Sequence, residues 1–114
     1  MSIKNIDAFF HPKSIALIGA STRDRSVGGI LMSNLLNGGF KGPIMPVNPK
    51  AAAVNGVVAY KDVASLPVVP DLAIIATPPG SIPATIDELG ARGTRGAVVI
   101  TAGLRHQRRK RRLA

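Results

Sequence analysis

The stretch SIALIGASTRDRSVGGI, residues 14–30, decides the fold class of this chain. Residues 14–18 form a short aliphatic run ended by Gly19, which is typical of a buried strand. Ser26 stands where the N-cap of a following helix is expected. The apolar residues that follow it at helical spacing are Val27, Ile30, Leu31 and Leu35. The stretch therefore predicts a strand, a polar loop and a helix, in that order.

The same alternation continues along the chain. Short links join the expected elements, and glycines or prolines stand at most of their ends. The expected strands are residues 14–18, 43–47, 71–76 and 97–100, with brief pairing at 57–58. Three helices are expected. The first follows Ser26 and ends at Asn37-Gly38-Gly39, and the second is a short helix at 61–66. The third is capped by Ser81 and has Ile82, Ile86 and Leu89 on one face.

Alternating strands and helices predict an α/β fold, a Rossmann-like doubly wound parallel sheet. The length of 114 residues fits one domain. Only 4% of the residues are aromatic, and small aliphatic residues provide most of the apolar content, which suits parallel strands buried on both faces.

Composition excludes several classes of protein. There is no cysteine, so disulfides, thiolate chemistry and cysteine-bound metals are excluded. No apolar run reaches the roughly 20 residues that span a bilayer. The start, MSIKNIDAFF, lacks the pattern of a signal peptide, so we expect a cytoplasmic protein without membrane contact. No cluster of metal ligands or catalytic side chains is evident, so no catalytic or metal-binding residue is predicted.

The net charge of +9 is concentrated at the end of the chain. Six of the fifteen basic residues and none of the acids lie in residues 105–114, which leaves a net charge of +3 on the rest. We therefore expect a domain at 1–104 and a basic, disordered tail at 105–114. Two interpretations of the tail stay open: an out-of-frame end of the gene, or a contact with nucleic acid or an anionic surface. The body itself does not resemble a nucleic-acid binder.

The loops after the four main strands are the candidate site. The carboxyl ends of parallel strands meet at one edge of a sheet, where ligands of open α/β folds bind. Small residues, hydroxyls, helix-opening amides and one lysine gather there, a chemistry suited to phosphate. The predicted cofactor-binding residues are Gly19, Ala20, Ser21, Thr22, Ser26, Val27, Gly28, Asn48, Lys50, Thr77, Pro78, Thr101, Ala102 and Gly103.

The residues after the second strand discriminate between cofactors. An NAD site carries an acidic residue there, whereas this chain has Asn48-Pro49-Lys50. A lysine suits a phosphate, which favours coenzyme A or NADP. The loop also lacks the second glycine of the dinucleotide fingerprint. A stand-alone regulatory protein that binds NAD(P) or another nucleotide stays the alternative.

Four motifs together resemble a known family. FFHPKSIALIGAS, GGFKGPIMPVNPK, PDLAIIATPP and GTRGAVVITAGL resemble the CoA-binding domain of NDP-forming acyl-CoA synthetases, such as ADP-forming acetate–CoA ligase. The same domain begins the related protein lysine acetyltransferases that carry a GNAT domain. The chain is more distantly similar to the succinyl-CoA synthetase alpha subunit.

The resemblance implies how coenzyme A would lie. Residues 19–22 would contact the nucleotide part, and Lys50 would meet a phosphate of CoA. Residues 101–103 would line the path toward the thiol. In the family this domain continues into a further helix and strand, so the resemblance implies a sheet truncated at its C-terminal end.

The resemblance also bears on activity. In the family, further domains carry a phosphorylated histidine and bind ATP, and this chain has no counterpart of them. The resemblance therefore implies a CoA-binding module that does not carry out the ligase reaction alone. Its partners would be other domains or subunits of an acyl-CoA synthetase.

Overall fold

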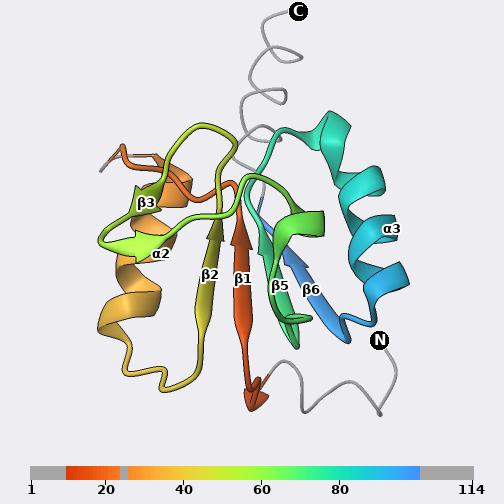
Figure 1. The fold of residues 1–114 in the computed structure, drawn as a ribbon, viewed down its shortest axis with the longest axis horizontal. Helices are drawn as coiled ribbons and strands as arrows, with labels where there is room; N and C mark the ends of the chain where they lie inside the picture. Colours follow the sequence, from red (N-terminus) through yellow and green to blue (C-terminus); the bar gives the residue numbers. More distant parts are fainter. Residues whose placement is uncertain (1–9, 24–25, 101–114) are drawn as a thin grey trace, which may run out of the picture.

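The computed structural model describes residues 10–23 and 26–100. Its centre is a parallel sheet of four strands in the order β2-β1-β5-β6. The strands are β1 (Ile15–Ile18), β2 (Ile44–Val47), β5 (Leu72–Ile75) and β6 (Gly96–Val99). All four point toward the same edge of the sheet (Figure 1). The predicted α/β fold with a parallel sheet is confirmed.

Helices cover both faces of this sheet. Ala16 and Ile18 of β1 pack in one cluster with Leu89 of α3 (Ile82–Arg92). Leu17 of β1 packs in a second cluster with Met32 of α2 (Val27–Asn37). Because successive side chains of a strand point to opposite faces, α2 and α3 lie on opposite sides of the sheet. The helix that follows β1 covers one face of the sheet, and the helix that follows β5 covers the other face. The topological switch point of the sheet therefore lies between the neighbouring strands β1 and β5.

The connection from β2 to β5 contains short elements. A hairpin of β3 (Ala53–Val54) and β4 (Val57–Val58) is followed by the 3-10 turn η2 (Val63–Ser65). Between these elements the backbone N–H of Tyr60 donates to the Pro46 carbonyl at 2.9 Å, which covers the outer edge of β2. Pro46 is accommodated because an edge strand tolerates the loss of one donor. The brief pairing at 57–58 and the short helix within 61–66 are confirmed.

The predicted apolar faces of the two helices are confirmed in part. Leu31 and Leu35 of α2 pack against the buried cluster that contains Leu17 and Met32, as predicted. Ile30 is 48% exposed, and Gly28, Gly29 and Met32 are the buried residues of α2. The reason is close approach: a Cβ added at Gly28 would lie 2.0 Å from the Gly19 carbonyl oxygen, so the helix start packs directly on backbone. In α3, Leu89 is buried as predicted, whereas Ile86 is 42% exposed.

Ser81 does not cap α3, so this prediction was wrong. The turn η3 (Pro79–Ser81) precedes the helix, and the Ser81 side chain makes no capping bond. Its Oγ instead donates to the Pro78 carbonyl oxygen at 2.9 Å. A helix that begins through such a turn leaves the serine backbone in a helical conformation, with φ −92° and ψ −9°, which is unsuitable for capping.

Within the described part of the chain, no helix combines the length and the apolar composition that crossing a bilayer requires. Thr101, Ala102, Gly103 and the basic tail lie outside the described residues.

Candidate functional site

The loops at the carboxyl ends of the strands are tied to each other. The Gly19 N–H donates to the Val47 carbonyl at 3.1 Å, and the Ala76 N–H donates to the Ile18 carbonyl at 2.8 Å. Gly19 has a φ of +95°, and a Cβ there would lie 2.8 Å from the Ala76 carbonyl oxygen. Both constraints require glycine at this position. The ends of β1, β2 and β5 therefore form one continuous edge (Figure 1).

A first hollow, here called the Lys50 hollow, lies between the loop after β1 and the loop after β2. Its volume is about 380 Å³. It is lined by Ser21, Thr22, Arg23, Asn48, Lys50 and Ala51. Arg23 and Lys50 are exposed, and neither side chain makes a hydrogen bond or ion pair with another described residue. Among the described residues that line this hollow there are two cations, two hydroxyls and no acid, which is the character of an anion site.

Asn48 joins the two walls of the Lys50 hollow. Its Nδ2 donates to the Ala20 carbonyl oxygen at 2.9 Å. Its Oδ1 accepts from the backbone N–H groups of Lys50 at 2.8 Å and Ala51 at 3.0 Å. The side chain thus shapes the turn that presents Lys50 and fixes that turn against the first loop. Asn48 acts by organising the site as well as by lining it.

The start of α2 completes the first loop. Ser26 is extended, with φ −75° and ψ 157°, and its Oγ accepts from the Gly29 N–H at 3.0 Å, so the predicted N-cap is confirmed. The same Oγ donates to the Arg23 carbonyl oxygen at 2.8 Å. The Arg23 N–H in turn donates to Ser21 Oγ at 3.0 Å. These hydrogen bonds fix the backbone conformation of the loop at Arg23.

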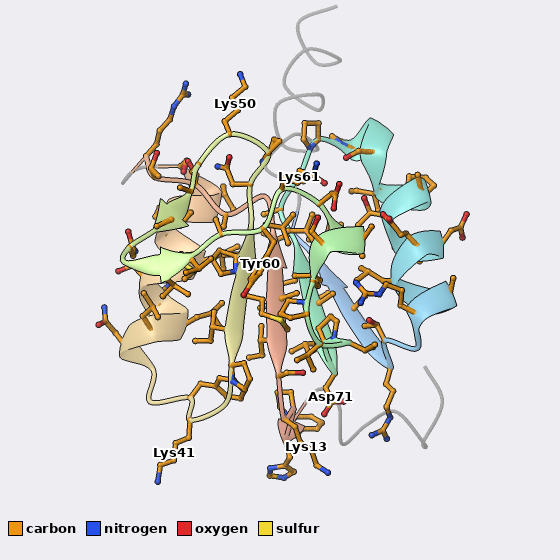
Figure 2. The ribbon with its side chains drawn as sticks, in the orientation of Figure 1. Lys13, Lys41, Lys50, Tyr60, Lys61 and Asp71 are labelled. Atoms are coloured by element: carbon orange, nitrogen blue, oxygen red, sulfur yellow. The ribbon has the colours of Figure 1, made fainter. Side chains whose placement is uncertain are left out.

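A second hollow, here called the Thr85 hollow, lies on the α3 side of the same edge. Its volume is about 230 Å³. It is lined by residues at the ends of β1 and β2, in the loop after β5, in α3 and around the start of η2. Its polar lining comprises Lys61, Asp62, Thr77, Ser81, Thr85 and Glu88. Figure 2 places Lys50 and Lys61 at this edge and Lys41 at the opposite edge of the sheet.

Two hydrogen bonds from Ser65 hold the Asp62 carboxylate at the start of η2. Its Oδ1 accepts from Ser65 Oγ at 2.6 Å and from the Ser65 N–H at 2.9 Å. The hydroxyl bond is the main cause that holds the pKa of Asp62 below its ordinary value, and the nearby charge of Lys61 adds to it. Asp62 is therefore ionised at neutral pH and is engaged in capping η2.

The predicted site residues divide between these features. Ser21, Thr22, Asn48 and Lys50 line the Lys50 hollow, whereas Gly19 and Thr77 line the Thr85 hollow. Ala20 is buried beneath the loop. The other described residues of the prediction that line neither hollow are Ser26, Val27, Gly28 and Pro78. Lys50 and the loop after β1 do converge, as their positions in the sequence indicated.

Several lining residues escaped the sequence reasoning. Arg23 and Glu88 were not among the predicted site residues, because a charged side chain in a loop or on a helix is most often solvated. Ser81, Thr85 and Glu88 recur at i, i+4 and i+7, which is a single helix face and could have marked them. Only the position of α3 beside η2 makes this face a wall of a hollow.

The described side chains at the carboxyl edge of the sheet are suited to binding a ligand and do not form a catalytic group. Within residues 10–23 and 26–100, no group of three His, Asp or Glu side chains could hold a metal ion. The hydroxyls, amides and cations of the Lys50 hollow are donors placed for a phosphate ligand. This arrangement suits a nucleotide held by its phosphates.

Comparisons with known proteins agree with a site that binds a phosphate-bearing nucleotide. The family model described as a CoA binding domain matches residues 13–114. The chain is 43% identical over 93 residues to the ADP-forming acetate–CoA ligase of Methanocaldococcus jannaschii, covering 82% of this chain and 13% of the ligase. It is 42% identical over 99 residues to the alpha subunit of ADP-forming acetate–CoA ligase II of Pyrococcus furiosus, covering 86% of this chain and 21% of the subunit.

A solved structure shows the same fold. The dinucleotide-forming acetyl-coenzyme A synthetase 1 of Ca. Korarchaeum cryptofilum, in complex with phosphate and ADP, superimposes with a TM-score of 0.81 at 38% sequence identity. The match covers 86% of this chain and 21% of that chain. The chain thus spans about a fifth or less of the length of these relatives. On the match of its sequence, its parallel sheet and its loop edge, this chain belongs to the CoA-binding domain family, whose ligand is coenzyme A.

Proposed function

We propose that the chain holds coenzyme A by its phosphate groups in the Lys50 hollow. The observation that carries this proposal is that Arg23 and Lys50 line one hollow together with the hydroxyls of Ser21 and Thr22, and that the described lining residues include no acid. Coenzyme A carries a pyrophosphate and a 3′-phosphate, so two cations and several donors complement it. Neither cation has a partner among the described residues that a ligand would have to displace.

The other predicted residues have supporting roles in this proposal. Gly19 and Ala20 let the ligand approach the backbone, and Ser26 orders the loop by capping α2. Val27 and Gly28 open the helix, whose positive end favours an anion nearby. Thr77 and Pro78 would border the ligand where it crosses β5. Thr101, Ala102 and Gly103 would line its path toward the thiol end.

We further propose that this module serves an ADP-forming acyl-CoA ligase. The curated relatives are ligases of this kind, and the chain corresponds to a small part of each. The phosphoryl and acyl transfers would then be carried out by other domains or subunits, with this module presenting CoA to them. The regulatory alternative, with NAD(P) as ligand, has no support from the family match.

Isothermal titration calorimetry of the chain with CoA, NADP and NAD tests the proposal. We expect CoA to bind and NAD not to bind. Lys50→Ala should weaken CoA roughly tenfold or more, the range of one hydrogen bond to a charged group. Lys41→Ala is the matched control, because Lys41 is an exposed lysine at the opposite edge (Figure 2). Equal losses for both variants, or unchanged affinity for Lys50→Ala, would contradict the proposed site.

A further inference from the structure

The two outer strands of the parallel sheet, β2 and β6, differ in what lies along their free edges (Figure 1). The outer edge of β2 is covered: the Tyr60 N–H donates to the Pro46 carbonyl oxygen, and the Asn48 N–H donates to the Tyr60 carbonyl oxygen, both at 2.9 Å. Within residues 10–23 and 26–100, β6 pairs with β5 and with no other strand. In the described part of the chain, the outer edge of β6 is therefore open to a further strand.

The register of β6 shows which of its backbone groups face outward. The N–H groups of Gly96 and Ile100 donate to carbonyl oxygens on the β5 side, at 3.0 and 2.8 Å. Because successive residues of a strand alternate between its two edges, Ala97 and Val99 direct their N–H and C=O groups away from β5. The sequence of β6, Gly-Ala-Val-Val, contains no charge and no proline. An edge without these protective residues favours pairing with another strand.

The side chains of Ala97 and Val99 lie on the face of the sheet that carries α3. In the register of β5 with β6 they lie beside Ala73 and Ile75, which belong to the same buried cluster as Leu89 of α3. Ala97 and Val99 are nevertheless exposed, and Val99 retains 41% of its accessible surface. Val99 is therefore an apolar projection near the carboxyl end of an open edge.

A third hollow, here called the Ile86 hollow, lies near the amino end of the same strand. Its volume is about 200 Å³, and it is lined by Ile86, Leu89 and Gly90 of α3 and by residues 94–97. Ile86 is 42% exposed, and a Cβ added at Gly90 would meet nothing within 4 Å. Because α3 forms one wall, the hollow lies on the same face of the sheet as Val99. An open edge thus carries an apolar projection at one end and a mostly apolar hollow at the other.

We propose that two copies of this chain pair antiparallel along β6, about a two-fold axis at Ala97, and form one continuous sheet with four strands from each copy. At the axis, the outward N–H and C=O groups of Ala97 exchange hydrogen bonds with those of Ala97 of the second copy. The same register places Val99 of each copy opposite residue 95 of the other, beside its Ile86 hollow. A two-fold contact requires one self-complementary surface. A second copy meets this requirement because it supplies both the projection and the hollow at matching positions.

The contact is small, so the dimer should be weak. Five paired residues span about 17 Å, and a strand edge with one hollow on each side buries less than the roughly 800 Å² per partner of a standard stable complex. The dimer should therefore dissociate on dilution. This inference does not depend on the proposed function, because antiparallel pairing directs the carboxyl edges of the two sheets in opposite directions and leaves both Lys50 hollows open.

Sedimentation velocity of the full chain tests the pairing. The average mass should rise from one chain toward two as the concentration rises from about 10 μM to about 1 mM, the range of a weak interface. Ala97→Lys places two ammonium groups opposite each other, and Val99→Lys places one at an apolar hollow, so each should raise the midpoint about tenfold or more. Val58→Lys is the matched control, because Val58 is 62% exposed on β4, on the β2 side of the sheet (Figure 1). A chain that stays monomeric at about 1 mM, or equal losses in all three variants, would overturn the proposal.

Disulfide formation tests the register. The chain has no cysteine, so Ala97→Cys introduces a single thiol in each copy. A hydrogen-bonded antiparallel pair holds its Cα atoms about 5.5 Å apart, within the range of a disulfide. With oxidised glutathione, Ala97→Cys should form the covalent dimer faster than Val98→Cys or Val58→Cys. Equal rates for Ala97→Cys and Val58→Cys, or a faster reaction of Val98→Cys, would overturn the proposed pairing. Circular dichroism establishes that each variant is folded, and if a lysine variant is not, the result for Ala97→Cys decides, because that side chain is small and exposed.

Discussion

Asn48 Nδ2 donates to the Ala20 carbonyl oxygen at 2.9 Å, joining two loops that are 28 residues apart in the chain. This bond connects the end of β2 to the end of β1 beside the hollow that Arg23 and Lys50 both line. The relative position of the two cations therefore depends on an uncharged side chain. Coenzyme A binding should depend on it as well.

Replacing Asn48 tests this dependence. Asn48→Ala should lower the free energy of unfolding by about 1–3 kcal/mol, because it leaves a partly buried carbonyl without its donor. Calorimetry should also show CoA affinity falling several-fold, since the turn that presents Lys50 loses its acceptor. Asn34→Ala, at an exposed position of α2, should leave CoA affinity unchanged and should not lower the free energy of unfolding, because alanine favours the helix. Unchanged affinity in Asn48→Ala would show that the turn is held by other means.

Two glycine substitutions should act in opposite directions. Gly28→Ala would place a Cβ 2.0 Å from the Gly19 carbonyl oxygen, so we expect a loss of about 1–3 kcal/mol of stability from overpacking. Gly90→Ala meets nothing within 4 Å and should raise stability by about 0.5–1 kcal/mol through helix propensity. Urea denaturation measures both. A neutral Gly28→Ala would mean that α2 can move away from the strand end without loss.

Arg92 and Arg23 should have separable roles. Arg92→Gln removes the charged donor to the carbonyls of Val63 and Leu66, so stability should fall by about 1–2 kcal/mol. Arg23→Gln should leave stability unchanged, because the side chain is exposed, and should weaken CoA binding. Thermal denaturation and calorimetry on both variants give the comparison. If Arg23→Gln destabilised the fold and left the affinity for CoA unchanged, Arg23 would not be part of the anion site.

The Ser65 hydroxyl should depress the pKa of Asp62. A carbon-detected NMR titration of the Asp62 carboxyl should give a midpoint below the ordinary 3.8, and Ser65→Ala should raise it toward that value. Because the folded-state pKa is lowered, the associated stability is present above the unfolded-state pKa and is lost as the pH falls through the folded-state value. A midpoint that Ser65→Ala leaves unmoved would contradict this cause.

Deleting residues 105–114 tests whether the basic segment belongs to the site. The domain proposed at 1–104 contains all the proposed CoA-binding residues, so CoA affinity should be unchanged in the shortened chain. Any affinity of the full chain for DNA or RNA should disappear with the removed charge, and its salt dependence should disappear too. Loss of CoA binding on deletion would instead assign the segment a role in the cofactor site.

The fold class was readable from local sequence because strands and turns have local signatures. The aliphatic run at 14–18, Gly19 and the N-cap at Ser26 identify a strand, a loop and a helix without knowledge of distant contacts. Topology then places the loop after β1 beside the loop after β2, since parallel strands end at one edge. The convergence of Ser21 and Thr22 with Lys50 followed from that rule.

The buried faces and the second hollow were decided by tertiary structure. Ile30 satisfies the same helical pattern as Leu31 and Leu35, which pack on the core, and it is nevertheless exposed, because the start of α2 at Gly28 lies directly against the Gly19 backbone. Glu88 satisfies the pattern of a solvated charge and nevertheless lines a hollow, because Arg92 holds η2 against α3. Sequence periodicity indicates which residues share a face of a helix. What that face contacts depends on elements distant in sequence, whose approach is determined by packing.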